Sequence, residues 1–327
     1  MSKPLISLRN LTKVFETKGG TGVRAIDGIS LDVQHGQTLG IVGETGSGKS
    51  TLGRLMLRLI EPTSGEVTFN NVNLLEVKAK ELRQYRRQMQ MIFQDPLASL
   101  DPRMSVGNLI MEPLIIHDIG NKIERIQMVQ EILAKVGLSP DAFDRFPHEF
   151  SGGQRQRISI ARAIITQPQL IVADEPVSAL DVSIQSQILN LMLDLRREFN
   201  LTYVFISHDL AVVQHIADVV VVMYLGKIVE MAPAVEIFTN PKHPYTKALI
   251  SAIPQIDAAH RKDRIVLIGD IPSPRNPPTG CHFHPRCPQV MATCSTNAPH
   301  LINLNPVIGR SNAHTVSCHL YPEVGER

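Results

Sequence analysis

A glycine-rich stretch near the start of the chain has the spacing of a phosphate-binding loop. Residues 43–50 read Gly-Glu-Thr-Gly-Ser-Gly-Lys-Ser and fit the pattern G-x-x-x-x-G-K-[ST]. The apolar run Thr38–Val42 has the length of a strand, and the stretch Thr51–Ile60 after the loop has helical character. In such a loop the backbone N–H groups converge on phosphate oxygens, and the start of the next helix adds partial positive charge. The sequence therefore predicts a nucleotide-phosphate site.

Each residue of this loop has an expected role. The ammonium group of Lys49 is expected to bind the β- and γ-phosphates, and the Ser50 hydroxyl is expected to ligate Mg²⁺. The other positions of the loop that we expect to contact ATP are Gly43, Glu44, Thr45, Gly46, Ser47, Gly48 and, at the start of the helix, Thr51.

Two carboxylates follow a second apolar run. Leu170–Ala173 has the composition of a strand that is buried on both faces, and Asp174 and Glu175 come directly after it. The carboxyl ends of parallel strands are where α/β folds bind ligands. Asp174 is suited to hold Mg²⁺, and Glu175 to orient and polarise the attacking water. A glutamate with a pKa of about 4.3 is a weak base, which suffices because phosphoryl transfer needs mostly positioning and charge neutralisation.

A third motif carries a family resemblance. Ser151, Gly152, Gly153 and Gln154 resemble the signature sequence of ABC ATPases, and they lie upstream of the acidic pair as that family requires. The family more often has leucine where Phe150 stands. The resemblance implies that this segment contacts the γ-phosphate of an ATP bound by a partner subunit, so that two nucleotides lie between two chains.

The remaining elements of the same family occur in the same order. The resemblance implies that Phe15 stacks on adenine and that Gln94 senses Mg²⁺ and γ-phosphate. It also implies that Asp181 lies in the loop at the dimer interface and that His208 contacts the γ-phosphate. The expected magnesium-binding set is Ser50, Gln94 and Asp174, and the expected catalytic set is Glu175, His208 and Gln94.

The C-terminal part narrows the type of ABC ATPase. The segments Phe238–Leu249 and Pro272–Pro278 are similar to the tail of oligopeptide, dipeptide and nickel importer ATPases, most of all to the second ATPase subunit of dipeptide importers. The resemblance implies an ATP-hydrolysing motor that imports dipeptides or short peptides. Its implied partners are a second, non-identical ATPase, two integral-membrane permeases and an extracytoplasmic substrate-binding protein. Importers of nickel, longer oligopeptides or other solutes are the alternatives, followed by exporter motors and non-transport ABC ATPases.

Four cysteines occur only in the last 47 residues, with the spacing C-x5-C-x6-C-x23-C. They are Cys281, Cys287, Cys294 and Cys318. Structural zinc sites usually use pairs two to four residues apart, and structural disulfides are rare in a reducing cytosol. Four thiolates can ligate a [4Fe–4S] cluster, and the resemblance extends to importer ATPases that carry one. Plain or opportunistically metal-binding cysteines, and a zinc site, remain alternatives.

The elements that position these motifs alternate between strands and helices. Strands such as Thr38–Val42 and Tyr203–Ile206, with amphipathic helices such as Ser186–Glu198, are typical of an α/β nucleotide-binding core. The N-terminal strand signals at Leu5–Leu8, Ile29–Val33 and Gly65–Phe69 predict a small antiparallel β subdomain. We therefore expect an α/β fold: a P-loop NTPase core of the ABC ATPase type, with this subdomain, a helical signature subdomain and a loop-rich C-terminal extension. The expected division is an ATPase domain at 1–238 and a C-terminal region at 239–327.

Composition constrains the partners and the location. The 33 basic and 31 acidic residues nearly cancel, and they are dispersed, so we expect no nucleic-acid partner. The longest unbroken apolar run, Val219–Leu225, is far shorter than the roughly 20 residues that span a bilayer. The N-terminus also lacks the pattern of a signal peptide. We expect a peripheral protein that its partners hold at the cytoplasmic face of the inner membrane.

Overall fold

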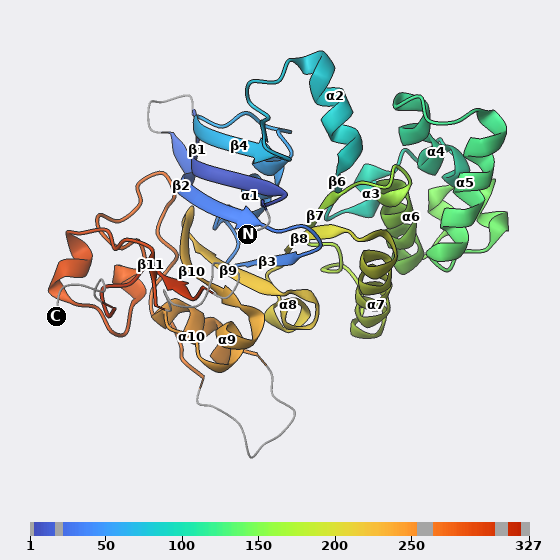
Figure 1. The fold of residues 1–327 in the computed structure, drawn as a ribbon. Coiled ribbons are helices and arrows are strands. Elements are labelled where there is room, and N and C mark those ends of the chain that lie inside the picture. The colour runs from blue at the N-terminus through green and yellow to red at the C-terminus, as the bar shows by residue number, and fades with distance from the viewer. Residues whose placement is uncertain (1–2, 17–21, 254–263, 305–312, 322–327) are drawn as a thin grey trace. The chain divides into compact units, whose positions relative to one another are not determined.

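The computed structural model describes residues 3–16, 22–253, 264–304 and 313–321. The chain divides into two compact units. The first unit takes its residues from 1–5, 33–38 and 69–207, and the second from 6–32, 39–68 and 208–327. Figure 1 shows the elements of both. Each unit contains strands and helices, so each is described separately.

The first unit is built on three parallel strands. They are β6 (Met89–Ile92), β7 (Leu170–Asp174) and β8 (Thr202–Ile206), and β7 lies between the other two. Every residue of β7 and β8 is buried, as expected for strands covered on both faces. The carboxyl ends of β7 and β8 are adjacent, since Asp174 pairs with Ile206 in the register.

Helices make up most of the rest of the first unit. The helices α4 (Val106–Ile116), α5 (Lys122–Lys135) and α6 (Gly152–Ile164) pack on one another, and α7 (Val182–Phe199) packs on α6 (Figure 1). Their apolar faces form a core that includes Leu109, Leu133 and Ile160. The elements other than the parallel strands are β5 (Val72–Asn73), α2 (Ala79–Gln88), α3 (Pro96–Ser99), α4 (Val106–Ile116), α5 (Lys122–Lys135), α6 (Gly152–Ile164), α7 (Val182–Phe199) and the 3-10 helices Pro140–Phe143 and Pro147–Glu149.

The second unit contains two groups of strands. In one, β3 (Thr38–Val42) pairs in parallel with β9 (Val219–Tyr224), and β9 pairs antiparallel with β10 (Lys227–Pro233). The short strand β12 (Thr315–Val316) pairs with β10, and β11 (Ile302–Asn303) pairs with β12. The other group has the order β2-β1-β4, with bounds Ile6–Phe15 for β1, Val23–Val33 for β2 and Ser64–Phe69 for β4.

In the described residues of the second unit, short α-helices and 3-10 helices accompany these strands. They are α1 (Lys49–Met56), α8 (Leu210–Ile216), α9 (Ala234–Thr239), α10 (Pro244–Ser251), and the 3-10 helices His284–Arg286 and Ala292–Ser295. No helix in the described parts of the chain is both long enough and apolar enough to span a membrane.

The fold class predicted from the sequence is confirmed. The strands at Thr38–Val42, Leu170–Asp174 and Thr202–Ile206 agree with the predicted runs to within a residue. The predicted helix Thr51–Ile60 instead begins at Lys49 and ends at Met56. The predicted domain boundary at residue 238 falls inside α9 and stays a prediction.

Candidate functional site

The phosphate loop lies in the second unit, between the buried strand β3 and helix α1. Gly43 and Gly48 have φ values of 153° and 102°, which favour glycine. A Cβ atom on Gly43 would lie 2.2 Å from the Met223 carbonyl oxygen, and one on Gly48 would lie 2.4 Å from that of Ala25. The chain therefore approaches its neighbours too closely for any other residue at these two positions.

Side chains of the loop already fit a bound phosphate. Lys49 is buried, and its ammonium group donates hydrogen bonds to the carbonyls of Gly43 at 2.7 Å and Glu44 at 3.0 Å. Among the described residues, the buried Ser47 hydroxyl has no hydrogen-bond partner. Unpaired buried hydroxyls are costly, and a phosphate oxygen would satisfy this one. The loop can thus hold a nucleotide phosphate, and Thr45 and Gly46 form its exposed tip.

The acidic pair lies in the first unit, at the carboxyl end of β7. Asp174 is buried, and Glu175 adopts a left-handed conformation with φ 47°. The Glu175 N–H donates to the Ile206 carbonyl of β8 at 2.9 Å, which fixes this turn. A non-glycine residue in this region stores about 1–3 kcal/mol of strain, a feature that clusters at functional sites.

Gln94 and Glu175 lie together although 81 positions separate them. The Gln94 amide donates a hydrogen bond to a Glu175 carboxylate oxygen at 3.0 Å. Gln94 follows β6, which is parallel to β7, so both side chains project from the same edge of the strands. At this edge the Gln94 amide and the Glu175 carboxylate can both hydrogen-bond one water molecule.

The signature segment forms the start of α6. Ser151 is the N-cap, and its hydroxyl accepts from the Gln154 N–H at 3.4 Å, while the Gln154 side chain accepts from the Ser151 N–H at 3.0 Å. This reciprocal capping box leaves Ser151 and Gly152 exposed. A Cβ on Gly153 would lie 2.6 Å from Ile184 of α7, so this glycine also permits close helix packing. Phe150, the departure from the family pattern, is buried.

The three other predicted residues lie at the ends of elements. Phe15 ends β1, is 39% exposed, and has the Lys13 ammonium 4.9 Å from its ring centroid. Asp181 is the exposed N-cap of α7. His208 is exposed and lies just before α8 in the second unit. Thus Phe15, the phosphate loop and His208 belong to the second unit, and the other predicted nucleotide-site residues belong to the first.

The four cysteines are free thiols in compact turns of the second unit. The Cys281 N–H donates to the Cys294 carbonyl at 2.8 Å, which brings these two segments together. Burial raises the pKa of the Cys281 and Cys287 thiols, and it raises that of Cys318 to about 11. The neighbouring thiols add to each of these shifts in the pKa. In the described residues, no group of three or more His, Cys, Asp or Glu side chains is arranged to hold a metal ion.

Two residues that sequence reasoning missed contact the phosphate loop. The Arg286 guanidinium forms an ion pair with the Glu44 carboxylate at 2.7 Å and 3.1 Å, and the Glu44 N–H donates to the Tyr245 hydroxyl at 2.9 Å. Arg286 lies in the stretch that contains the cysteines, and only the cysteines of that stretch had a predicted role. Both partners lie more than 200 positions from Glu44, so no local pattern could signal these contacts.

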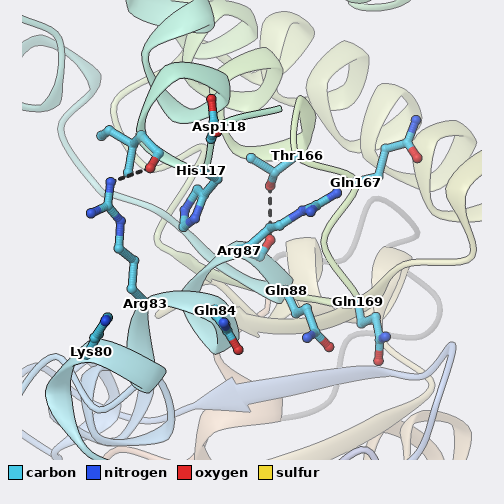
Figure 2. A pocket seen from close by; sticks show the side chains of 11 residues that line it. Lys80, Arg83, Gln84, Arg87, Gln88, His117, Asp118, Thr166, Gln167 and Gln169 are labelled. Atoms are coloured by element: carbon cyan, nitrogen blue, oxygen red, sulfur yellow. Dashed lines mark hydrogen bonds between the residues drawn. The ribbon is translucent and has the colours of Figure 1, made fainter. Parts of the chain in front are cut away.

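A basic cleft in the first unit lies away from the edge of the strands that carries Asp174 and Glu175. It encloses about 910 Å³ between α2, the end of α4 and the residues that precede β7 (Figure 2). Gln88 and Gln169, which precede β6 and β7, line it, so it lies at the amino ends of these strands. Asp174 lies at the opposite end of β7. The cleft is therefore not the site of the acidic pair.

The fold and these motifs define a class of protein. A glycine loop with a buried lysine, a strand that ends in two carboxylates, and a capped Ser-Gly-Gly-Gln helix are the parts of an ATP-binding cassette. The comparisons agree: residues 26–178 match the ABC transporter model. A solved structure with a TM-score of 0.65 and 30% identity, covering 70% of this chain and 98% of its own, is a dimeric post-hydrolysis state of the cassette MJ0796 bound to ADP and phosphate. The protein is an ABC-type ATP hydrolase, a class that uses ATP with Mg²⁺.

The tail and the relatives give the family. Residues 229–294 match the model of the oligopeptide/dipeptide transporter C-terminal region. The oligopeptide transport ATP-binding protein AppF of Bacillus subtilis is 49% identical, over 97% of this chain and 97% of its own. The dipeptide transport ATP-binding protein DppF of Haemophilus influenzae is 50% identical, over 91% and 93%. A putative peptide import ATP-binding protein of Brucella ovis is 52% identical, over 93% and 95%. The chain belongs to the oligopeptide/dipeptide family of ABC transporter ATP-binding proteins.

Proposed function

We propose that this chain is the ATP-hydrolysing motor of an importer of short peptides, and that dipeptides are its substrate class. The match of residues 229–294 to the oligopeptide/dipeptide transporter region carries the proposal, because it lies outside the cassette that all ABC transporters share. The names of the relatives AppF and DppF support peptides as the substrate class, and the name of DppF supports dipeptides in particular. Nickel and longer oligopeptides are the alternatives that the same tail leaves.

The proposed roles of the residues follow from the phosphate loop and from the edge of the strands that carries Asp174 and Glu175. Lys49 and the backbone of the phosphate loop bind the phosphates of ATP, and Ser50 and Asp174 hold Mg²⁺. Glu175 orients the attacking water, and Gln94 holds the Glu175 carboxylate and reports the state of the nucleotide. Catalysis by positioning suits this arrangement because phosphoryl transfer requires little covalent chemistry from the protein.

The exposed start of α6 supports a dimeric mechanism. Ser151 and Gly152 are solvent-facing in this chain, so the Gly152 N–H and the Ser151 hydroxyl, which only accepts in the capping box, can serve a nucleotide on another subunit. We propose that ATP binding closes this chain on a second, non-identical ATPase. Closure then moves two permeases, to which an extracytoplasmic binding protein delivers the peptide. Closure requires that ATP bind the closed state more tightly, since equal affinity would shift nothing. The motor would be peripheral, at the cytoplasmic face of the inner membrane.

Uptake in cells tests the motor and its substrate together. The only copy of the gene would encode wild type or the Glu175→Gln variant, and uptake of labelled dipeptide, labelled oligopeptide and nickel would be measured. The proposal predicts loss of dipeptide uptake alone. Unchanged dipeptide uptake with loss of one of the other two would overturn the dipeptide assignment and leave the motor. Unchanged uptake of all three would overturn the importer.

We also propose that the four cysteines hold a [4Fe–4S] cluster. The chemistry of the donors fits, since all four are free thiols of one unit and the Cys281 N–H donates to the Cys294 carbonyl. The cysteine spacing favours a cluster over a structural zinc site, which usually uses pairs two to four residues apart. The cluster would join turns that have little apolar core. Anaerobic purification should yield a brown protein with about four iron and four sulfide per chain, and Cys294→Ser should lose them. A colourless, iron-free anaerobic preparation would refute the cluster.

A further inference from the structure

One arginine of the cysteine-bearing segment, Arg286, forms an ion pair with the phosphate loop. Two guanidinium nitrogens of Arg286 bond the two oxygens of the Glu44 carboxylate, at 2.7 Å and 3.1 Å. The Arg286 side chain is 8% exposed and that of Glu44 is 24% exposed. A two-point contact of this kind fixes orientation as well as distance. Both residues belong to the second unit, so their contact lies within one compact body.

Packed aromatic rings hold Arg286 in this position. The buried Phe283 lies 5.3 Å from both Tyr224 and Tyr245, between ring centroids. Tyr224 also faces the guanidinium, with 5.9 Å from its ring centroid to the guanidinium carbon. Tyr245 in turn accepts the Glu44 N–H. The cluster therefore fixes both the arginine and the backbone of the residue that it binds.

The charge of Glu44 makes this contact matter for nucleotide binding. Glu44 is the second residue of the phosphate loop, and its carbonyl already accepts from Lys49. A free carboxylate on this loop would repel the phosphates of ATP. At an effective dielectric constant of about 20, the repulsion between two unit charges roughly 10 Å apart lowers affinity by more than tenfold. Arg286 cancels this charge and holds it to one side.

We propose that Arg286 is a positioning residue of the ATPase, which neutralises Glu44 and so makes the four-cysteine segment part of the ATP site. One feature of this contact is not required for simple attachment of the C-terminal segment to the second unit. The Arg286 Nε atom is buried without a hydrogen-bond partner among the described residues. Apolar packing fastens a segment at lower cost than a partly unsatisfied buried cation. Arg286 also directly precedes Cys287 in the chain. A structural change at Cys287 would therefore act on the phosphate loop through Arg286.

A double-mutant cycle in the full-length chain tests the proposal. Binding of a fluorescent ATP analogue with Mg²⁺ would be measured for wild type, Arg286→Met, Glu44→Gln and the double variant. Methionine keeps an apolar stem against Tyr224 and removes the charge. We expect Arg286→Met to weaken binding about tenfold when Glu44 is present, and less than twofold when residue 44 is glutamine. Equal losses in both backgrounds, or no loss in either, would overturn the proposal.

Three controls separate charge from folding and from the cluster. Arg286→Lys should keep at least about a third of the wild-type affinity, because it keeps the charge while losing the two-point geometry. If it loses as much as Arg286→Met, neutralisation of Glu44 is not the role. Arg103→Gln removes an exposed arginine that pairs with Asp101 in the first unit, and it should leave ATP affinity unchanged. The thermal midpoint and iron content of each variant show whether the rescue by Glu44→Gln is independent of the tail and its cluster.

Discussion

Acid should loosen the region that holds the phosphate loop, and His243 should be a main cause. His243 is the N-cap of α10, and its Nδ1 accepts the Tyr245 N–H at 3.0 Å. Burial lowers the pKa of His243 from 6.5 to about 4, although the nearby Glu230 carboxylate acts in the opposite direction. Tyr245, on this helix, holds Glu44. Protonation of His243 therefore acts on a structural element that contacts the nucleotide loop.

The sign and size of the effect follow from the two pKa values. Below pH 6.5 the unfolded chain binds a proton at this histidine that the folded chain does not, so stability falls as the pH falls toward 4. Each pKa unit corresponds to 1.36 kcal/mol, so the full effect is about 3 kcal/mol, of which about 2 kcal/mol develops between pH 7 and pH 5. The pKa of Glu230 is lowered, against the burial that would raise it, by hydrogen bonds led by that from His314. Glu230 therefore titrates below this window.

Urea unfolding of wild type and His243→Asn at pH 7 and pH 5 measures this effect. The chain has no tryptophan, so the fluorescence of its five tyrosines reports unfolding, together with circular dichroism. Asparagine retains a capping oxygen but does not titrate. Histidines common to both chains cancel in the comparison. Wild type should lose about 2 kcal/mol more than the variant over this pH range. Equal losses would refute the assignment of the acid sensitivity to His243.

Further predictions concern the ATP site. Lys49→Ala removes the charged donor of the phosphate loop, so ATP affinity measured by fluorescence titration should fall at least about tenfold, and an unchanged affinity would contradict its role. Gly152→Ala should leave the thermal midpoint near that of wild type, because its Cβ would have only an ordinary contact, yet it should reduce ATP turnover in the dimer by crowding the nucleotide. Gly153→Ala is the matched variant: its Cβ would clash with Ile184, so it should cost about 1–3 kcal/mol of stability in urea unfolding. Equal stability of these two glycine variants would contradict the packing described for α6.

Features set by short stretches of sequence were predictable. The phosphate loop, the acidic pair and the signature segment each depend on residues within about eight positions. Their spacing therefore encodes both the geometry and the chemistry. The fold class followed from the alternation of buried strands and amphipathic helices. The roles expected for Phe15 and His208 came from resemblance alone, and their positions at the ends of β1 and before α8 leave those roles predictions.

Contacts between distant segments could not be predicted. The ion pair of Arg286 with Glu44 joins residues 242 positions apart, and no period or local pattern announces such a partner. The same holds for the hydrogen bond of Gln94 to Glu175, which depends on the register of β6 and β7. Cysteine spacing predicted a ligand set for a cluster, which stays a prediction, and it did not predict the contact between Cys281 and Cys294 that brings two turns together.

The most direct test of the motor is ATP turnover in the assembled importer. The chain, its partner ATPase and the permeases would be reconstituted in vesicles, and hydrolysis would be measured with and without binding protein loaded with dipeptide. We predict that the loaded binding protein stimulates hydrolysis, and that Glu175→Gln reduces the stimulated rate at least about 100-fold while ATP still binds. A rate of ATP hydrolysis that does not change with loaded binding protein would contradict the account. A Glu175→Gln complex that keeps a substantial rate of ATP hydrolysis would also contradict it.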